Sequence, residues 1–166
     1  MNVKELFEMQ RELDQHIMDK HPELKEADNL YWKVLALQVE LGELAQEFRG
    51  FKMWSNNREM NREKALEEYV DCLHFVISIG LDLGHSNFHK HLSYAVVGGK
   101  RVNELIIREF NEVFSASARV QYTGDYEYLT RSFANLGALL GFQWSEIEQA
   151  YKSKNQVNHA RQEANY

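Results

Sequence analysis

Four carboxylates recur in two pairs along one stretch of the chain. Glu40 and Glu43 are three residues apart, and so are Glu68 and Asp71. On an α-helix this spacing puts both side chains of a pair on one face, about one turn apart. Four carboxylates brought together by two packed helices repel one another, and burying them is tolerable mainly with a cation between them. Oxygen ligands favour Mg²⁺, with Mn²⁺ as a substitute, over Zn²⁺.

Spacing alone leaves part of this ligand set open. Glu47 follows Glu43 by four residues and Glu67 precedes Asp71 by four, so either can share the same helix face. A solvated helix face is the ordinary explanation for a single pair of acids. Two pairs, with His74 one turn beyond the second, favour a metal site.

A second group of polar side chains recurs at helical spacing near the C-terminus. It consists of Tyr151, Lys154, Asn155, Asn158, Arg161 and Gln162. Lysine offers phosphate oxygens a point charge, arginine a fork of donors, and amides offer neutral donors. The competing interpretation is a solvated terminal helix. Opposite four acids that hold Mg²⁺, the stripe would complete a site for a phosphate chain.

Three further residues have side chains suited to a nucleobase. Gln10 and Asp14 are one helical turn apart and can hydrogen-bond a base edge, while Trp54 lies in a polar segment where an indole can stack on a base. A loop tryptophan packed onto the core is the alternative. Cys72, the only cysteine, is expected to be an inert packing residue.

The elements that must position these residues are predicted to be helices. Pro22 is the only proline, and strand-like alternation is nearly absent. Apolar periodicity, capping boxes at Asn2 with Glu5 and at Ser145 with Glu148, and breaks at Gly84 and Gly98-Gly99 delimit the helices. They are expected over about 2–21, 28–48, 61–83, 101–114, 125–141 and from 145 onwards. The loop over residues 49–60 favours antiparallel packing of the two acidic helices.

We therefore expect an all-α fold. Four core helices would surround the acidic metal site, with additional helices from the second half, in a single domain over residues 1–166. A net charge of -6 argues against direct nucleic-acid binding and against an anionic membrane surface. The lone cysteine and the lack of a signal or membrane-spanning pattern favour a cytoplasmic location.

Five motifs together carry a family resemblance. They are M-Q-R-E-L-D in the first helix, E-L-G-E at 40–43, F-K-M-W at 51–54, E-E-Y-V-D-C-L-H-F at 67–75, and Y-x-x-K-N-x-x-N-x-x-R-Q ending at Gln162. In this order and spacing the chain resembles the dimeric, all-α dUTPase family, which is related to MazG-like and other all-α nucleoside triphosphate pyrophosphohydrolases. Residues 86–145 match only loosely, so no functional residue is assigned there.

The resemblance implies a role for each candidate residue. The Mg²⁺ ligands would be Glu40, Glu43, Glu68 and Asp71, which excludes the alternatives left open by spacing. Glu43 would also orient or deprotonate the attacking water. Phosphates would be bound by Lys154, Asn158 and Arg161, with Tyr151 and Asn155 nearby. His74 would meet the 3′-hydroxyl, and uracil would be read by Gln10, Asp14 and Trp54. Asp14 departs from members that carry an amide there, and a carboxylate accepts but does not donate unless protonated.

The expected function is Mg²⁺-dependent hydrolysis of dUTP, and of dUDP, to dUMP by a homodimer. One alternative keeps the chemistry and changes the base, giving a house-cleaning pyrophosphohydrolase for dCTP or a damaged nucleotide. Another is a non-catalytic nucleotide-sensing partner of a regulatory protein. A di-iron bundle is a weaker rival because it needs two Glu-x-x-His pairs, and this stretch offers only Asp71 with His74.

Overall fold

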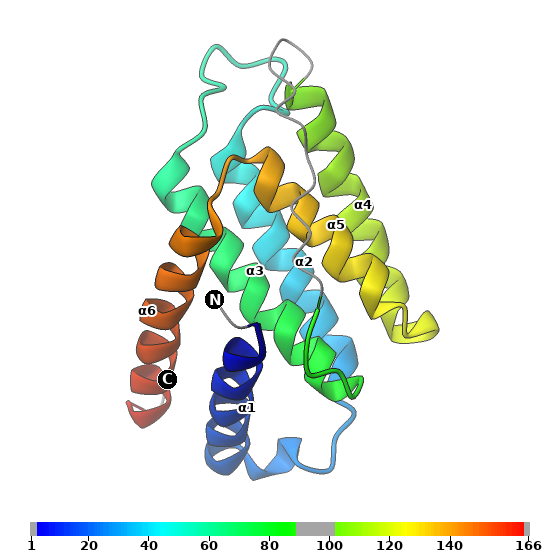
Figure 1. The fold of residues 1–166 in the computed structure, drawn as a ribbon, viewed down its shortest axis with the longest axis vertical. Helices are drawn as coiled ribbons and strands as arrows, with labels where there is room; N and C mark the ends of the chain where they lie inside the picture. The colour runs from blue at the N-terminus through cyan, green and yellow to red at the C-terminus, as the bar shows by residue number, and fades with distance from the viewer. Residues whose placement is uncertain (1–2, 89–101, 165–166) are drawn as a thin grey trace.

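The computed structural model describes residues 3–88 and 102–164. These residues form six α-helices and one short 3-10 helix, with no strand among them, so the expected all-α fold is confirmed (Figure 1). The helices are α1 (Val3–Lys20), η1 (Pro22–Leu24), α2 (Leu30–Phe48), α3 (Arg62–Asp82), α4 (Val102–Thr123), α5 (Tyr126–Leu139) and α6 (Trp144–Glu163).

Helices α2 and α3 form an antiparallel pair at the centre of the bundle (Figure 1). Both bury the apolar rows expected from their periodicity, which are Val34, Leu37, Leu41, Leu44 and Phe48 on α2 and Val70, Leu73 and Ile77 on α3. Cys72 is also fully buried. The apolar contact fixes the rotation of each helix, and so fixes which face carries the acids.

The other helices pack on two sides of this pair. Helices α1 and α6 contact each other and α3, while α4 and α5 contact each other and pack on α2 and α3 (Figure 1). Close approach of α5 to α3 depends on Gly80, where a Cβ would lie 2.4 Å from the ring of buried Tyr126. Four helices, α1, α2, α3 and α6, therefore converge on the acidic residues, and α4 and α5 support the pair from the other side.

Two of the expected helix boundaries are wrong. Helix α4 does not end near Phe114 but continues to Thr123, because Ala116, Ser117 and Val120 extend its buried row. The last helix is not capped by Ser145 with Glu148. Instead, Oε2 of Glu146 accepts a hydrogen bond from the Gln143 N–H at 2.8 Å, which places the cap two residues earlier.

The glycine stop after α3 is confirmed. Gly84 has a φ of 81°, and its N–H donates to the Leu81 carbonyl, so the chain leaves the helix in the left-handed conformation that glycine favours. The expected cap at Asn2 and the break at Gly98-Gly99 lie outside the described residues.

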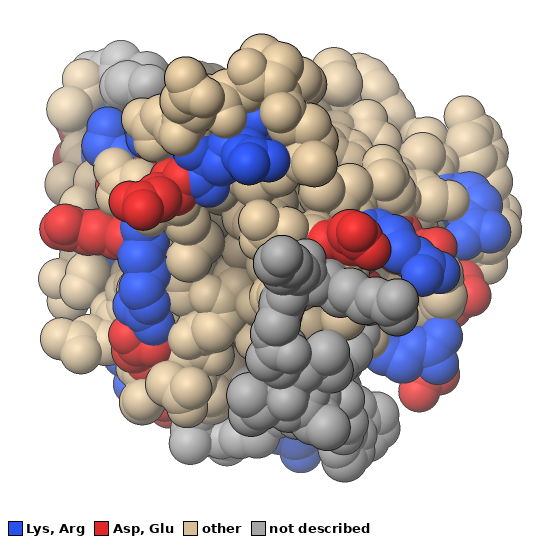
Figure 2. Space-filling view, turned by 90° about the horizontal axis from the view of Figure 1, so that it is seen from above, with Lys and Arg blue, Asp and Glu red and all other residues tan. Residues whose placement is uncertain are grey.

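The surface of the bundle mixes both signs of charge. On the face in Figure 2, Lys and Arg side chains lie beside Asp and Glu side chains, and no extended field of one sign gathers there among the described residues. None of the described helices is both long and apolar enough to cross a membrane.

Candidate active site

Three carboxylates from the central helix pair meet in one cluster. Glu40 of α2 and Glu68 and Asp71 of α3 each contribute an oxygen, and these oxygens lie within 4.8 Å of one another. All three side chains are half-buried. We call these residues the acidic cluster. Its all-oxygen donor set suits a hard cation, so the cluster could hold a metal ion.

The acidic cluster is electrostatically strained as a set of anions. Burial raises the pKa of Glu40 to about 7, and the charges of Asp71, Glu43 and Glu68 add to the effect. Burial likewise raises the pKa of Glu68, with Asp71 and Glu43 contributing, and burial raises the pKa of Asp71. The carboxylates therefore hold their charge less readily than in water, and a bound cation would reverse that tendency.

The other nearby acids stand apart from this cluster. Glu43 is exposed, and its charge reaches the cluster through its effect on Glu40 and Glu68. Glu67 is also exposed and lies 3.3 Å from Nζ of Lys154. Glu47 lies 3.7 Å from Arg49. Among the described residues, neither Glu47 nor Glu67 joins the acidic cluster.

Helix α6 brings a positive charge to the cluster. Nζ of Lys154 lies 2.6 Å from Oδ2 of Asp71, in a site where both side chains are largely buried. Burial opposes the charged form of Lys154, but its hydrogen bond to Asp71 and the charge of that carboxylate outweigh it, so the lysine pKa is raised. The expected phosphate-binding lysine thus lies beside the expected metal ligands.

A cavity of about 320 Å³ opens beside the acidic cluster. This volume lies in the range of small-molecule sites. The cavity is lined by Gln10, Leu13, Asp14, Ile17, Trp32, Glu40, Asp71, His74, Phe75, Ser78, Asn158, Arg161 and Gln162. Expected metal ligands, phosphate-binding residues and base-reading residues therefore share one cavity between α1, α2, α3 and α6.

A chain of hydrogen bonds orients the polar groups along one wall. Oε1 of Gln10 accepts from the Tyr151 hydroxyl at 2.6 Å and lies 2.8 Å from Nδ1 of His74. Because a carbonyl oxygen can only accept, Nδ1 of His74 carries the proton and Nε2 is left as an acceptor. Burial lowers the pKa of His74 to about 3, so the ring is neutral. Its Nε2 is buried without a hydrogen-bond partner among the described residues.

Tyr151 and Asn155 lie deeper than the rest of the C-terminal stripe. The Tyr151 ring is fully buried and stacks on His74 at a centroid distance of 4.0 Å. The Asn155 amide is buried and donates to the Met9 carbonyl at 3.5 Å. Both side chains hold α6 against α1, while Asn158 and Arg161 face the cavity.

Trp54 lies away from this cavity. Its side chain is 78% exposed, and its ring makes an edge contact with Phe51 at a centroid distance of 6.0 Å. It is not among the residues that line the cavity. The exposed face of the indole is therefore accessible to a ligand or partner that approaches from solvent, outside this cavity.

Five lining residues were not singled out as functional from the sequence, and three of them lie on the two acidic helices. Phe75 follows Asp71 by four residues and Ser78 follows His74 by four, so both share the acidic face of α3. Trp32 lies two turns before Glu40 on α2. Helical spacing from the acids was the available signal for all three.

We expect the metal-free protein to lose stability as the pH rises. The folded-state pKa of Glu40, about 7, exceeds its ordinary value of 4.5, so the stability it contributes is full below 4.5 and is lost as the pH rises through 7. Thermal unfolding in EDTA should give a wild-type Tm that falls by several degrees across this window. Glu40→Gln cannot ionise and should show a flatter profile. Equal slopes for the two proteins would contradict this account.

A family model described as dUTPase matches residues 2–166. A comparison with curated proteins gave no match.

Proposed function

The chain belongs to the dUTPase family and is a dUTP diphosphatase, and we propose that it hydrolyses dUTP with Mg²⁺ held by Glu40, Glu68 and Asp71. The reaction consumes one water and releases dUMP and pyrophosphate. The observation that carries the proposal is the convergence of three carboxylate oxygens within 4.8 Å beside a cavity of about 320 Å³. Mn²⁺ is the proposed substitute because it takes the same ligands.

The acids of the site have two proposed roles: binding the metal ion and activating the attacking water. A bound Mg²⁺ supplies charge neutralisation for the phosphate oxygens and lowers the pKa of water. Glu43 joins the ligand set at its exposed side, orients the attacking water and accepts its proton. Its exposure supports this role, because solvent can deliver water to it and take the proton away.

The phosphate chain is proposed to lie against α6. Lys154 is already placed beside Asp71, and Asn158 and Arg161 line the same cavity. Cationic donors at this wall stabilise the charge that develops on the leaving pyrophosphate. A diphosphate retains part of this contact, so we propose that dUDP is also hydrolysed, with release of phosphate.

The nucleoside is proposed to lie between α1 and α3. Nε2 of His74 is a buried acceptor without a partner, and it would accept a hydrogen bond from the 3′-hydroxyl. Gln10 and Asp14 would read the uracil edge. Because Trp54 lies away from this cavity, its exposed ring is not one of the contacts proposed for a base bound here. We assign Tyr151 and Asn155 supporting roles beneath these groups.

We propose that the protein is a homodimer in which each protomer is a single domain over residues 1–166 and the two protomers contact each other through α2. Tyr31, Leu35 and Val39 are spaced by four residues on α2 and are 64%, 61% and 52% exposed. Apolar side chains in one exposed row are typical of an interface.

Leu35→Glu should convert the dimer into a monomer, because it buries a charge in that row. Sedimentation equilibrium measures the outcome. Val157→Glu places the same charge at an exposed valine on α6 and should leave the dimer intact. A wild-type monomer, or a dimeric Leu35→Glu variant, would exclude this interface.

Pyrophosphate release, measured with dUTP, dTTP, dCTP and UTP, should be much faster with dUTP than with the other three. EDTA should abolish the release. Glu43→Gln should lower kcat by roughly 100-fold or more, the usual worth of a general base, with little change in KM. Glu47→Gln, one turn further along α2 and outside the acidic cluster, serves as the matched control. Unchanged kcat in Glu43→Gln would refute its role, and preference for another base would refute the uracil contacts.

His74→Phe should erase the preference for dUTP over 2′,3′-dideoxy-UTP. Phenylalanine keeps a ring against Tyr151 but removes the acceptor, and one hydrogen bond is worth about 1 kcal/mol, or roughly 3- to 10-fold in kcat/KM. The ratio between the two nucleotides cancels any general effect on base binding. If wild type does not distinguish them, His74 does not meet the 3′-hydroxyl.

A further inference from the structure

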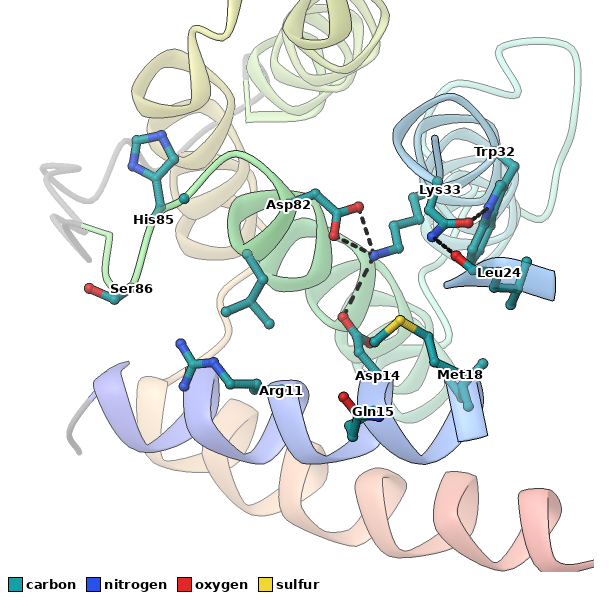
Figure 3. Close-up of a pocket in the computed structure, with 14 residues that line it drawn as sticks. Arg11, Asp14, Gln15, Met18, Leu24, Trp32, Lys33, Asp82, His85 and Ser86 are labelled. Carbon is teal, nitrogen blue, oxygen red and sulfur yellow. Dashed lines mark hydrogen bonds and ion pairs between the residues drawn. The ribbon is translucent and has the colours of Figure 1, made fainter. Parts of the chain in front are cut away.

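Lys33 is a buried cation that joins three helices beside the active site. Its side chain is 8% exposed, and Nζ lies 2.9 Å from Oδ1 and 2.7 Å from Oδ2 of Asp82. The same Nζ lies 3.7 Å from Oδ2 of Asp14 (Figure 3). Lys33 thus reaches from α2 between a carboxylate of α1 and one of α3. A second cavity of about 340 Å³ lies against this group and shares Asp14, Ile17 and Trp32 with the cavity beside the acidic cluster, which we call the nucleotide cavity.

The carboxylate of Asp14 is held from several sides. Oδ1 accepts from Nε2 of Gln10 at 2.7 Å, and Oδ2 accepts from the Ser78 hydroxyl at 2.6 Å. Burial raises the pKa of Asp14, while the charge of Lys33 and the hydrogen bonds from Ser78 and Gln10 oppose that rise and Asp82 adds to it. Lys33 is the largest of the opposing causes. Without it, this carboxylate would take up a proton more readily.

An anionic Asp14 decides how the Gln10 amide is turned. A carboxylate can only accept, so the NH₂ group of Gln10 must face it, and Oε1 then faces His74 and Tyr151. The second N–H of the amide is left for a ligand, as is the spare acceptor capacity of Asp14, and both residues line the nucleotide cavity. Together they offer one donor and one acceptor.

This pair of groups matches one kind of base edge. Uracil presents an N–H flanked by carbonyl oxygens, so it can donate to Asp14 and accept from Gln10. Cytosine presents an unprotonated ring nitrogen at the same position, which would face the carboxylate acceptor to acceptor. A protonated Asp14 would reverse that preference, because it could donate to cytosine.

We propose that Lys33, anchored on Asp82, is a positioning residue for base selection, which keeps Asp14 an acceptor and through it fixes the Gln10 amide. Lys33 need not touch the nucleotide. The inference rests on the proposed function in that Gln10 and Asp14 are its base-reading residues.

The test is a double-mutant cycle on base discrimination, with kcat and KM measured for dUTP and dCTP. Lys33→Met should raise KM for dUTP and lower the dUTP-over-dCTP ratio of kcat/KM by about 10-fold or more, as expected when a buried polar group loses its partner. The kcat for dUTP should change by less than about twofold. In an Asp14→Asn background, Lys33→Met should leave the ratio unchanged within about twofold, because its effect passes through Asp14.

Two controls separate this role from plain stability. Lys33→Arg keeps the charge and should retain most of the wild-type ratio. Lys25→Met removes a surface lysine whose Nζ lies 2.8 Å from Oδ1 of Asp19. This change should leave the dUTP-over-dCTP ratio at its wild-type value. Equal effects of Lys33→Met in both backgrounds, or an unaltered ratio in a folded variant, would overturn the proposal. The proposal would also be overturned if Lys33→Met lowered the Tm but left the dUTP-over-dCTP ratio of kcat/KM unchanged.

Folding failure of the single variant does not end the test. The double variant Lys33→Met with Asp14→Asn leaves only Asp82 without its lysine, and that side chain is 31% exposed to solvent. Its ratio is compared with that of Asp14→Asn alone. Ratios that agree within about twofold support the proposal, and a larger difference overturns it. A wild-type enzyme that does not prefer dUTP to dCTP would refute the proposed base reading itself, before any variant is compared.

Discussion

Repulsion among half-buried carboxylates is the constraint around which this bundle is built. Glu40, Glu68 and Asp71 must come within a few ångströms of one another to share a cation, although burial and then the charge of Asp71 raise the pKa of Glu40 and of Glu68. Such proximity requires a backbone that cannot relax. The antiparallel α2 and α3 provide it through their buried apolar rows, and α6 adds Lys154 as a fixed counter-charge at 2.6 Å. Apolar packing on the opposite face of α2 and α3 thus offsets the repulsion among the carboxylates.

Beside this charged end, recognition depends on a connected set of hydrogen bonds. Gln10 is its central member, because its amide links Asp14 on its own helix to His74 on α3 and Tyr151 on α6. In a low-dielectric site an unpaired polar group is costly, so the bonds that Gln10 makes leave each of these groups one orientation. The atoms left over, Nε2 of His74 above all, are therefore presented to the cavity in a defined protonation state.

Much of this arrangement could be predicted from the sequence because it is local and periodic. The buried rows of α2 and α3 and the three-residue spacing of the acids each follow from one helical repeat. The cap of α6 was not distinguishable in this way, since Gln143 with Glu146 and Ser145 with Glu148 both offer a side chain three residues before a glutamate. The longer α4 was missed because the small residues after Phe114 weaken the apolar pattern that continues to Val120.

The partners of buried polar groups were beyond sequence reasoning. Lys33 stands next to Val34 in an inward-facing row, but its two carboxylates come from other helices, and only the assembled bundle brings them together. Tyr151 likewise shares its helical stripe with Lys154, yet the rotation of α6 against α1 buries its ring. Such pairings depend on tertiary geometry, which periodicity does not encode.

Cys72 follows the cluster acid Asp71 directly, yet helical rotation turns it into the packed interior. Burial raises the pKa of this thiol well above its ordinary value, and the charges of Glu40, Asp71 and Glu68 raise it further. Oxidants and alkylating reagents react with the thiolate, and this thiol is both protonated and sealed from solvent. As it is the chain's only cysteine, oxidants and alkylating reagents meet no reactive thiol in the folded protein.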